Sequence, residues 1–285
     1  MALTWQPTDA KTGELIPEIW STRIINHVRS NLICANVVDT TWKKEMSKGD
    51  ILMIPLLKAL STGAVDTSNR ESVNNENTTV TDTSDTITVD TWTEAVVMLD
   101  DSTVRQTHLP SLLAKLADNA AYALEKAIDT AVNAHFSSLT STWAGADGQT
   151  FTDDLMINLM EGLDEADVPR ENRSLVIDPS VIADIYRIDK FVHLNYQTTA
   201  VIPSGNIGQI YGVPVYVTNN LTATTTGNYG ALLHKEAIAL VMQEEFKVEK
   251  WRVPAAASDA IAVRCLYGEE VLRSTFGAYF YTRKK

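Results

Sequence analysis

The sequence predicts an α+β protein with two extended parts, a long helix and a long polar loop. Apolar residues recur at three- and four-residue spacing over residues 109–138, which is typical of one amphipathic helix. The 26 residues from 61 to 86 contain only four apolar side chains, and β-like segments bracket them. The rest of the chain alternates shorter helical and β-like segments without an internal repeat.

Composition and charge exclude several functional classes. The 285 residues are 45% hydrophobic and 21% charged, enough for about two domains. Twenty-four basic and 36 acidic residues give a net charge of −12, which disfavours broad binding to nucleic-acid phosphates. No basic stretch precedes an apolar block at the N-terminus, and no apolar run approaches the roughly 18 residues of a membrane span. Two distant cysteines make no disulfide framework, so we expect a soluble chain made in the cytosol.

The N-terminal region is expected to form an arm followed by a helix. Residues 1–13 are polar, with Trp5 among the few apolar side chains, and predict an extended arm. Residues 15–31 place apolar side chains four apart and predict an amphipathic helix. Residues 32–38 are β-like, and a turn at Gly49 and Asp50 leads into a strand over residues 51–55.

The polar segment between the predicted strands is the most informative part of the chain. After it, residues 87–99 alternate between two faces. One face carries Ile87, Val89, Ala95, Val97 and Leu99, and the other carries Thr88, Asp90, Trp92 and Glu94. Four small apolar side chains cannot offset the conformational entropy lost when 26 residues become ordered. We expect this segment either to move freely in solvent or to be ordered by neighbouring chains, as a projecting two-stranded arm laid across a partner would be.

The long helix begins near Pro110, a residue that suits the first helical turn. Its predicted apolar stripe comprises Leu113, Leu116, Ala120, Leu124, Ala127, Ala131 and His135, widened by Ala117, Ala121 and Ile128. Some 28 residues would make a rod of roughly 42 Å. A globule of this size has a radius of gyration of about 19 Å, so a flat, extended subunit is expected.

The C-terminal half shows clear helix starts. Thr152 precedes a helix that stops before Pro169, and Asp178 with Pro179 predicts a second N-terminus. The predicted strands cover residues 175–177, 213–218, 237–242, 246–253, 261–266 and 275–281.

No catalytic constellation is found, so we expect no enzyme, no catalytic or cofactor-binding residue, no metal ligand and no cofactor. The nucleophile-elbow, zinc-protease, P-loop and dinucleotide motifs are absent from the sequence. The glycines of residues 205–212 have the wrong spacing for a dinucleotide loop. The five histidines are scattered singly, without a Cys or second His at zinc-ligand spacing. Adjacent acidic pairs, such as Asp153 and Asp154 at a helix start, favour capping over shared proton chemistry.

Taken together, several segments resemble the major capsid proteins of tailed double-stranded DNA bacteriophages, whose fold encapsulin shells share. The segments are residues 14–20, 48–55, the polar arm before 87–99, 207–220 and 267–277. Their order and spacing cover nearly the whole chain.

The resemblance implies the tailed-phage major capsid fold in five regions. These are an N-terminal arm and helix (1–48), an extended β-hairpin loop (49–100), a peripheral domain with a long spine helix (101–151), an axial domain around the capsomer axis (152–252), and C-terminal strands that return to the peripheral domain (253–285).

The resemblance also implies a function. The chain would assemble as pentamers and hexamers into an icosahedral head shell that encloses double-stranded DNA without sequence-specific binding. A separate scaffolding protein and a portal protein would be partners, no membrane would be involved, and the shell, built in the host bacterial cytoplasm, would become part of the virion. Some family members weld their shells through a Lys–Asn bond, but no lysine occurs between Lys58 and Lys115, so we expect a non-covalent shell.

Candidate inter-subunit contacts are few, and alternatives remain. The candidates are Trp5 and Trp20 in the arm, Arg70, Glu71 and Glu76 in the loop, and Trp92 on the outward strand face. The loop charges could equally be solvated. An encapsulin-like cargo shell and a minor virion or neck protein are alternatives without catalysis. A soluble enzyme with the long loop as a lid is an alternative of another class, and it would be a compact monomer.

Overall fold

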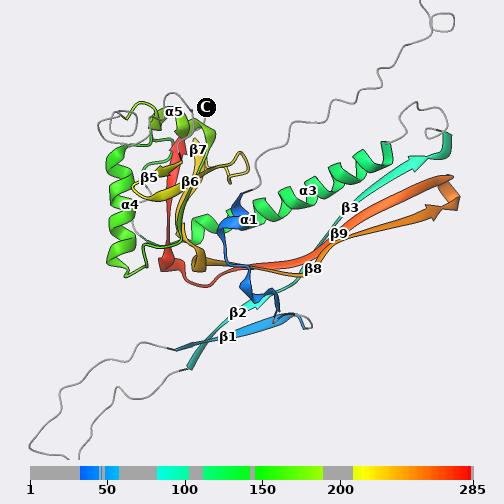
Figure 1. Ribbon diagram of the computed structural model, residues 1–285, viewed down its shortest axis with the longest axis horizontal. Helices are drawn as coiled ribbons and strands as arrows, with labels where there is room; N and C mark the ends of the chain where they lie inside the picture. Colours follow the sequence, from blue (N-terminus) through cyan, green and yellow to red (C-terminus); the bar gives the residue numbers. More distant parts are fainter. Residues whose placement is uncertain are drawn as a thin grey trace, which may run out of the picture.

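The computed structural model describes residues 33–44, 46, 49–57, 82–102, 112–141, 145–188 and 208–283. Three parts are visible in Figure 1: an α/β body at one end, a long sheet lined by one helix, and a two-stranded hairpin beside that sheet. The predicted helix over residues 15–31 and most of the polar segment of residues 61–86 lie outside the described residues.

The α/β body is built on a five-stranded sheet. In spatial order its strands are β10 (Gly277–Arg283), β7 (Gly227–His234), β4 (Arg173–Ile177), β6 (Val213–Val217) and β5 (Gln209–Ile210). The central strand β4 is fully buried and runs parallel to β6 and antiparallel to β7. Helices α4 (Asp153–Glu165) and α5 (Pro179–Ile185) pack on one face through the core around Leu159, Ile177 and Phe280.

Both predicted helix starts are confirmed. The Thr152 hydroxyl accepts a hydrogen bond from the Leu155 amide at 3.3 Å, and Asp153 and Asp154 lie in the first turn of α4. The Asp178 carboxylate accepts from the Ser180 amide at 2.9 Å, with Pro179 as the first residue of α5. Side-chain acceptors therefore satisfy amides that have no partner within the helix.

The long sheet has the strand order β3 (Thr91–Asp100), β9 (Ser258–Val271) and β8 (Ile238–Val253), all antiparallel. The two β-like runs expected at residues 237–242 and 246–253 form the single strand β8, with irregular pairing between Met242 and Lys247. The tight turn of Pro254–Ala256, with Ala257 in the left-handed region, joins β8 to β9. The expected boundary between the axial domain and the C-terminal strands, at residues 252 and 253, therefore falls inside the β8–β9 hairpin. Strand β10 pairs in the sheet of the α/β body.

The long helix α3 spans Leu112–Ala134 and continues as one 3-10 turn over His135–Ser138. At about 1.5 Å per residue its 23 residues extend about 35 Å beside β3 and β9 (Figure 1). Its buried stripe comprises Ala120, Leu124, Ile128, Val132 and Phe136. The predicted stripe followed Ala127, Ala131 and His135 instead, and these three are only half-buried. The larger Val132 and Phe136 take the core positions, which turns the stripe by one residue.

The hairpin consists of β1 (Ile51–Leu57) paired antiparallel with β2 (Asp82–Thr88). The predicted alternation holds, because Ile87 and Val89 are buried and β3 alternates regularly between half-buried and exposed residues. The expected continuous strand over residues 87–99 is divided, however, since the chain leaves β1 at Thr88 and joins β9 at Thr91.

A buried polar cluster connects three distant segments. The expected β-like stretch at residues 32–38 contains instead the short helix α1 (Cys34–Val37). The Asp129 carboxylate of α3 accepts the Cys34 amide at 2.7 Å and the Asn220 side-chain amide at 3.0 Å. The Asn133 side-chain amide donates to the Asn220 carbonyl at 2.9 Å. The cluster thus holds the start of the described chain, the long helix and the α/β body together.

Replacing Asp129 with Ala should lower the free energy of unfolding by about 3 kcal/mol, because two buried donors lose their acceptor. Chemical denaturation of the full-length chain measures this. Glu125→Ala, an exposed carboxylate on the same helix, is the control and should change stability by less than about 0.5 kcal/mol. Equal effects of the two variants would show that the cluster does not hold the three segments.

Candidate assembly surfaces

Of the six candidate contact residues, the structure describes one. Trp92 lies on β3 with 61% of its surface exposed, on the outward face that the alternation predicts. The other candidates lie outside the described residues: Trp5, Trp20, Arg70, Glu71 and Glu76.

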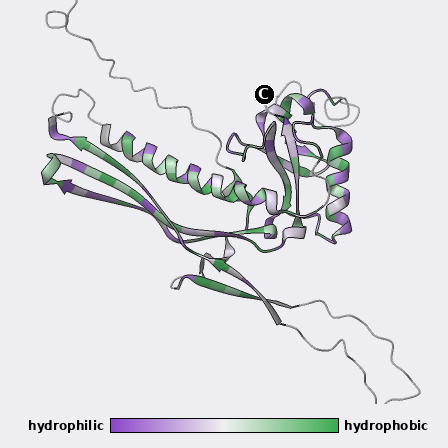
Figure 2. Cartoon of the chain, turned by 180° about the vertical axis from the view of Figure 1, so that it is seen from behind, coloured by the Kyte–Doolittle hydropathy of each residue, from purple (hydrophilic) through white to green (hydrophobic). Residues whose placement is uncertain are grey.

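Trp92 belongs to a larger apolar area on one face of the long sheet. The pairing register sets Met98, Ala260 and Trp251 in one row across the three strands, and Val96 beside Ala262 in the next. Val96 is 45% and Met98 52% exposed, whereas Ala260 and Ala262 of the middle strand β9 are fully buried. We call this area the outer sheet face: Trp92, Val96, Met98, Trp251, Ala260 and Ala262. Figure 2 shows hydrophobic and hydrophilic segments mixed along these strands.

The opposite face of the same sheet is covered. Ala95 and Val97 of β3, with Val263 and Cys265 of β9, pack against the buried stripe of α3. Within the described residues, no helix covers the outer sheet face in the same way. In the sequence, the unbroken apolar run of residues 95–99 indicates that the outer sheet face is apolar as well. Strands that are buried on both faces do not alternate between polar and apolar residues. The one-face pattern at residues 87–99 pointed to Trp92 but missed Val96 and Met98.

A charged network lies on the same side of the sheet. Arg264 of β9 contacts Glu94 and Glu249, each at 3.0 Å, and Lys247 reaches Glu249 at 2.9 Å. The hydrogen bond and charge of Lys247 hold the pKa of Glu249 below its usual range. These side chains are still about a third to a half exposed to solvent, so the network adds little to stability. It does fix the positions of alternating charges next to the apolar area.

Further charges gather at the far end of the sheet. Arg252 contacts Asp101 through both terminal nitrogens at 2.5 Å, and Asp259 at 3.2 Å. Lys250 also reaches Asp259 at 3.2 Å. Hydrogen bonds from Arg252 and Lys250 keep the pKa of Asp259 below its usual range. The end of the long sheet is thus a set of paired charges.

The hairpin offers a second uncovered apolar area. Ile51 and Met53 of β1 are exposed, opposite Thr88 and Thr86 of β2. The other face of the hairpin packs Ile54 and Ile87 against Ala239 and Val241 of β8.

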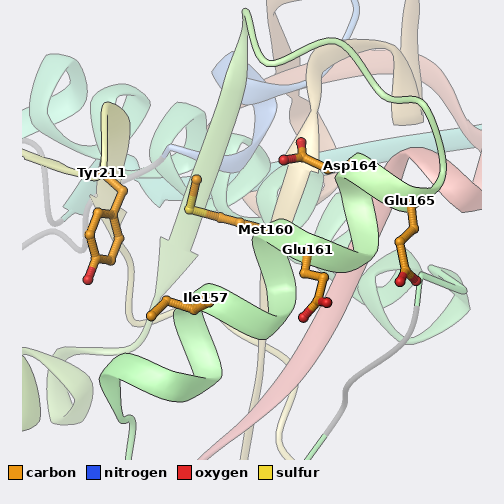
Figure 3. Close-up of a pocket in the computed structure, with 6 residues that line it drawn as sticks. All are labelled: Ile157, Met160, Glu161, Asp164, Glu165 and Tyr211. Atoms are coloured by element: carbon orange, nitrogen blue, oxygen red, sulfur yellow. The ribbon is translucent and has the colours of Figure 1, made fainter.

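A shallow hollow lies on α4, beside Tyr211 (Figure 3). Its volume is about 540 Å³, and its lining comprises Ile157, Met160, Glu161, Asp164, Glu165 and Tyr211. The Asp164 carboxylate accepts from Arg170 at 2.6 Å and from Arg173 at 2.7 Å, and these bonds lower its pKa. The Tyr211 hydroxyl donates to Asp153 at 2.6 Å. None of these lining residues is a histidine, a cysteine or a serine, so the hollow has no Ser–His or Cys–His pair.

Metal ligands, reactive cysteines and membrane-spanning helices are three further features that a functional site could use. The described residues contain no group of three or more His, Cys, Asp or Glu arranged to hold a metal ion. Both cysteines are buried, and burial raises the pKa of Cys34 and of Cys265, which makes neither a ready thiolate nucleophile. None of the described helices is both long and apolar enough to cross a membrane.

The chain resembles known proteins in sequence pattern and in fold. A family model described as phage capsid protein matches residues 82–275. A solved structure from Mycobacterium phage Che8 is 23% identical, with a TM-score of 0.82 over 94% of this chain and 97% of that one. The capsid structure of cyanophage P-SCSP1u is 17% identical, with a TM-score of 0.74 over 99% and 100%. The capsid of a native GTA particle is 13% identical, with a TM-score of 0.71 over the same shares. No curated protein sequence gives a match.

Proposed function

This chain belongs to the phage capsid protein family and is a structural protein of a head shell, and we propose that its copies form an icosahedral shell around the double-stranded DNA of a tailed bacteriophage. The outer sheet face carries this proposal. Its large side chains Trp92, Val96 and Met98 are exposed and no described helix covers them, and a second copy of the chain is the cover that a shell would supply.

The proposed contacts are individually weak and collectively strong. Covering one large apolar side chain contributes about 1.5–3 kcal/mol at most, so Trp92, Val96 and Met98 together give a modest gross contact. In a closed ring each copy both gives and receives the same heterologous contact, and each copy touches several neighbours. The paired charges around Arg264 set the alignment of neighbours more than the strength of their contact.

We assign the parts of the fold as follows. The α/β body that contains β4, α4 and α5 gathers around the capsomer axis as the axial domain. The long sheet and α3 form the peripheral domain, with α3 as its spine. The hairpin of β1 and β2 is the base of the extended loop, and residues 1–48 supply the arm. This assignment follows the sheets, so it moves β3, from the expected extended loop, and β8, from the expected axial domain, to the peripheral domain. It moves β10 to the axial domain.

The remaining partners follow from the same proposal. Pentamers and hexamers of this chain, a separate scaffolding protein and a portal protein would complete assembly in the host bacterial cytoplasm, and the chain would end in the virion. The net charge of −12 suits an inner wall along which packaged DNA slides, without sequence-specific contact. We propose no catalytic role and no cofactor. The family match favours a head shell over a cargo shell.

Replacing both Trp92 and Met98 with Ser should leave a folded chain that forms few or no particles. Both side chains are more than half exposed, so the loss in unfolding free energy is expected below about 1 kcal/mol, while the contact between copies loses most of its apolar area. Particle yield is measured by sedimentation and electron microscopy of cells that produce the complete set of head proteins.

Val248→Ser is the matched control for this double variant. Val248 is 60% exposed on β8, and the pairing register places it on the opposite face of the same sheet. It should assemble normally. Normal particles from the Trp92 and Met98 variant would remove the outer sheet face from the assembly contacts.

Deleting residues 66–82 should also give a folded chain that does not assemble, because the extended loop would no longer reach a neighbour. Size-exclusion chromatography and circular dichroism of the deletion variant test folding, and electron microscopy tests assembly. Normal shells from this variant would refute the role of the loop.

Denaturing electrophoresis of mature particles should show only single chains near 31.4 kDa, because the loop lacks a lysine for a covalent bond between copies. A ladder of linked chains that persists under reducing conditions would contradict the non-covalent shell.

A further inference from the structure

The hairpin joins the long sheet through the apolar contacts of Ile54 and Ile87 with β8 and through one close backbone contact with β9. On one side lie residues 88–90, where the chain passes from β2 to β3, and on the other lie residues 268–270 of β9. We call these two segments the hairpin joint. A Cβ atom placed on Gly268 would lie 2.1 Å from the Thr88 carbonyl oxygen, so only glycine permits the two backbones to approach so closely. On the hairpin side, the Val89 amide donates to the Asp50 carbonyl at 2.8 Å.

One residue of the joint carries a poorly accommodated charge. Glu269 is half-buried, and its Oε2 atom is buried without a hydrogen-bond partner among the described residues. The carboxylate loses hydration there, and the one hydrogen bond that it gains, from the Glu269 backbone amide, compensates only in part. Burial therefore raises the pKa of Glu269 above its usual value.

The surrounding charges increase this effect. Asp90 lies between β2 and β3, and Glu270 follows Glu269 on β9. The negative charges of both residues raise the pKa of Glu269 further. On β8, the residues opposite Glu269 and Glu270 are the uncharged Leu240 and Ala239. Tyr267, the next inward-facing residue on β9, is itself buried, and burial raises the pKa of its hydroxyl, which stays neutral. Asp90 and Glu269 thus carry like charges on opposite sides of the joint.

We propose that the hairpin joint is a proton-controlled hinge. When Glu269 is protonated, the repulsion across the joint is removed and the β1–β2 hairpin is held firmly against β9. When Glu269 is ionised, Asp90 and Glu269 repel each other across the joint, and the docking of residues 88–90 on β9 is weakened. The hinge is a property of the single chain, so it does not depend on the assembly contacts.

The direction of the pH dependence follows from the raised pKa. Between the unfolded and folded pKa values of Glu269, the docked joint binds more protons than the opened one. The docked state is therefore favoured below the ordinary glutamate pKa and loses that advantage as the pH rises through the folded value. Within this window the docking equilibrium should change by up to about tenfold per pH unit.

Hydrogen exchange of the full-length, unassembled chain tests the proposal. Amide protection in β1 and β2, corrected for the intrinsic pH dependence of exchange, should rise as the pH is lowered from about 8 to about 4, just below the ordinary pKa of glutamate. Glu269→Gln keeps the shape of the side chain but carries no charge. Its hairpin should show high protection at pH 8 and little further change in acid, while α4 in the distant α/β body should exchange as in the wild type.

Two further variants complete the test. Glu270→Gln, on the exposed neighbour, should keep a clear pH response. Asp90→Asn removes the opposing charge from the other side of the joint, so it should increase protection at pH 8, and it serves as the main test if Glu269→Gln does not fold. A wild-type pH response in both Glu269→Gln and Asp90→Asn would overturn the hinge, whether or not the chain forms shells.

Discussion

The constraint on which the structure depends is that one helix covers only one face of the long sheet. The stripe of α3 from Ala120 to Phe136 packs on the inward residues of β3 and β9. Trp92, Val96 and Met98 point the other way and stay exposed. A sheet of this length gains its full hydrophobic stabilisation only when both faces are buried. In the assembly that we propose, a neighbouring copy of the chain would supply the second half of that burial.

The buried cluster around Asp129 makes this arrangement rigid enough to be useful. A partner surface works best when it is preorganised, because less entropy is then lost on association. Asp129 connects α1, α3 and the segment at Asn220, so the long sheet with its helix and the α/β body share one buried anchor. The joint at Gly268 is different, since a close backbone approach there lies beside a carboxylate with one unpaired oxygen. The molecule thus combines a central polar anchor with a hairpin whose apolar packing on β8 adjoins a poorly accommodated charge.

Local patterns predicted local structure well and long-range pairing poorly. The caps at Thr152 and Asp178, the alternation of β3 and the extent of α3 follow from neighbouring residues and were found from the sequence. The helix at Cys34 was missed because its amide is held by Asp129, 95 residues away. The stripe of α3 was shifted because alanines at Ala127 and Ala131 mimic a core pattern that Val132 and Phe136 in fact provide. The division of 87–99 between two sheets depends on Gly268, which no local pattern connects to Thr88.

The mixture of apolar and charged groups on the outer side of the long sheet has its own logic. A purely apolar face would bind any apolar surface in any alignment, and it would trap misassembled copies. The alternating charges of this network are Glu94, Arg264, Glu249 and Lys247, and they are already paired within the chain. A neighbour that places a carboxylate beside Glu94 or Glu249, or a cation beside Arg264, is therefore disfavoured. Because these pairs are exposed, they add little to the strength of a correct contact. Contacts that are selective but weak can dissociate and re-form, which allows a growing closed shell to correct its errors before many contacts together make it permanent.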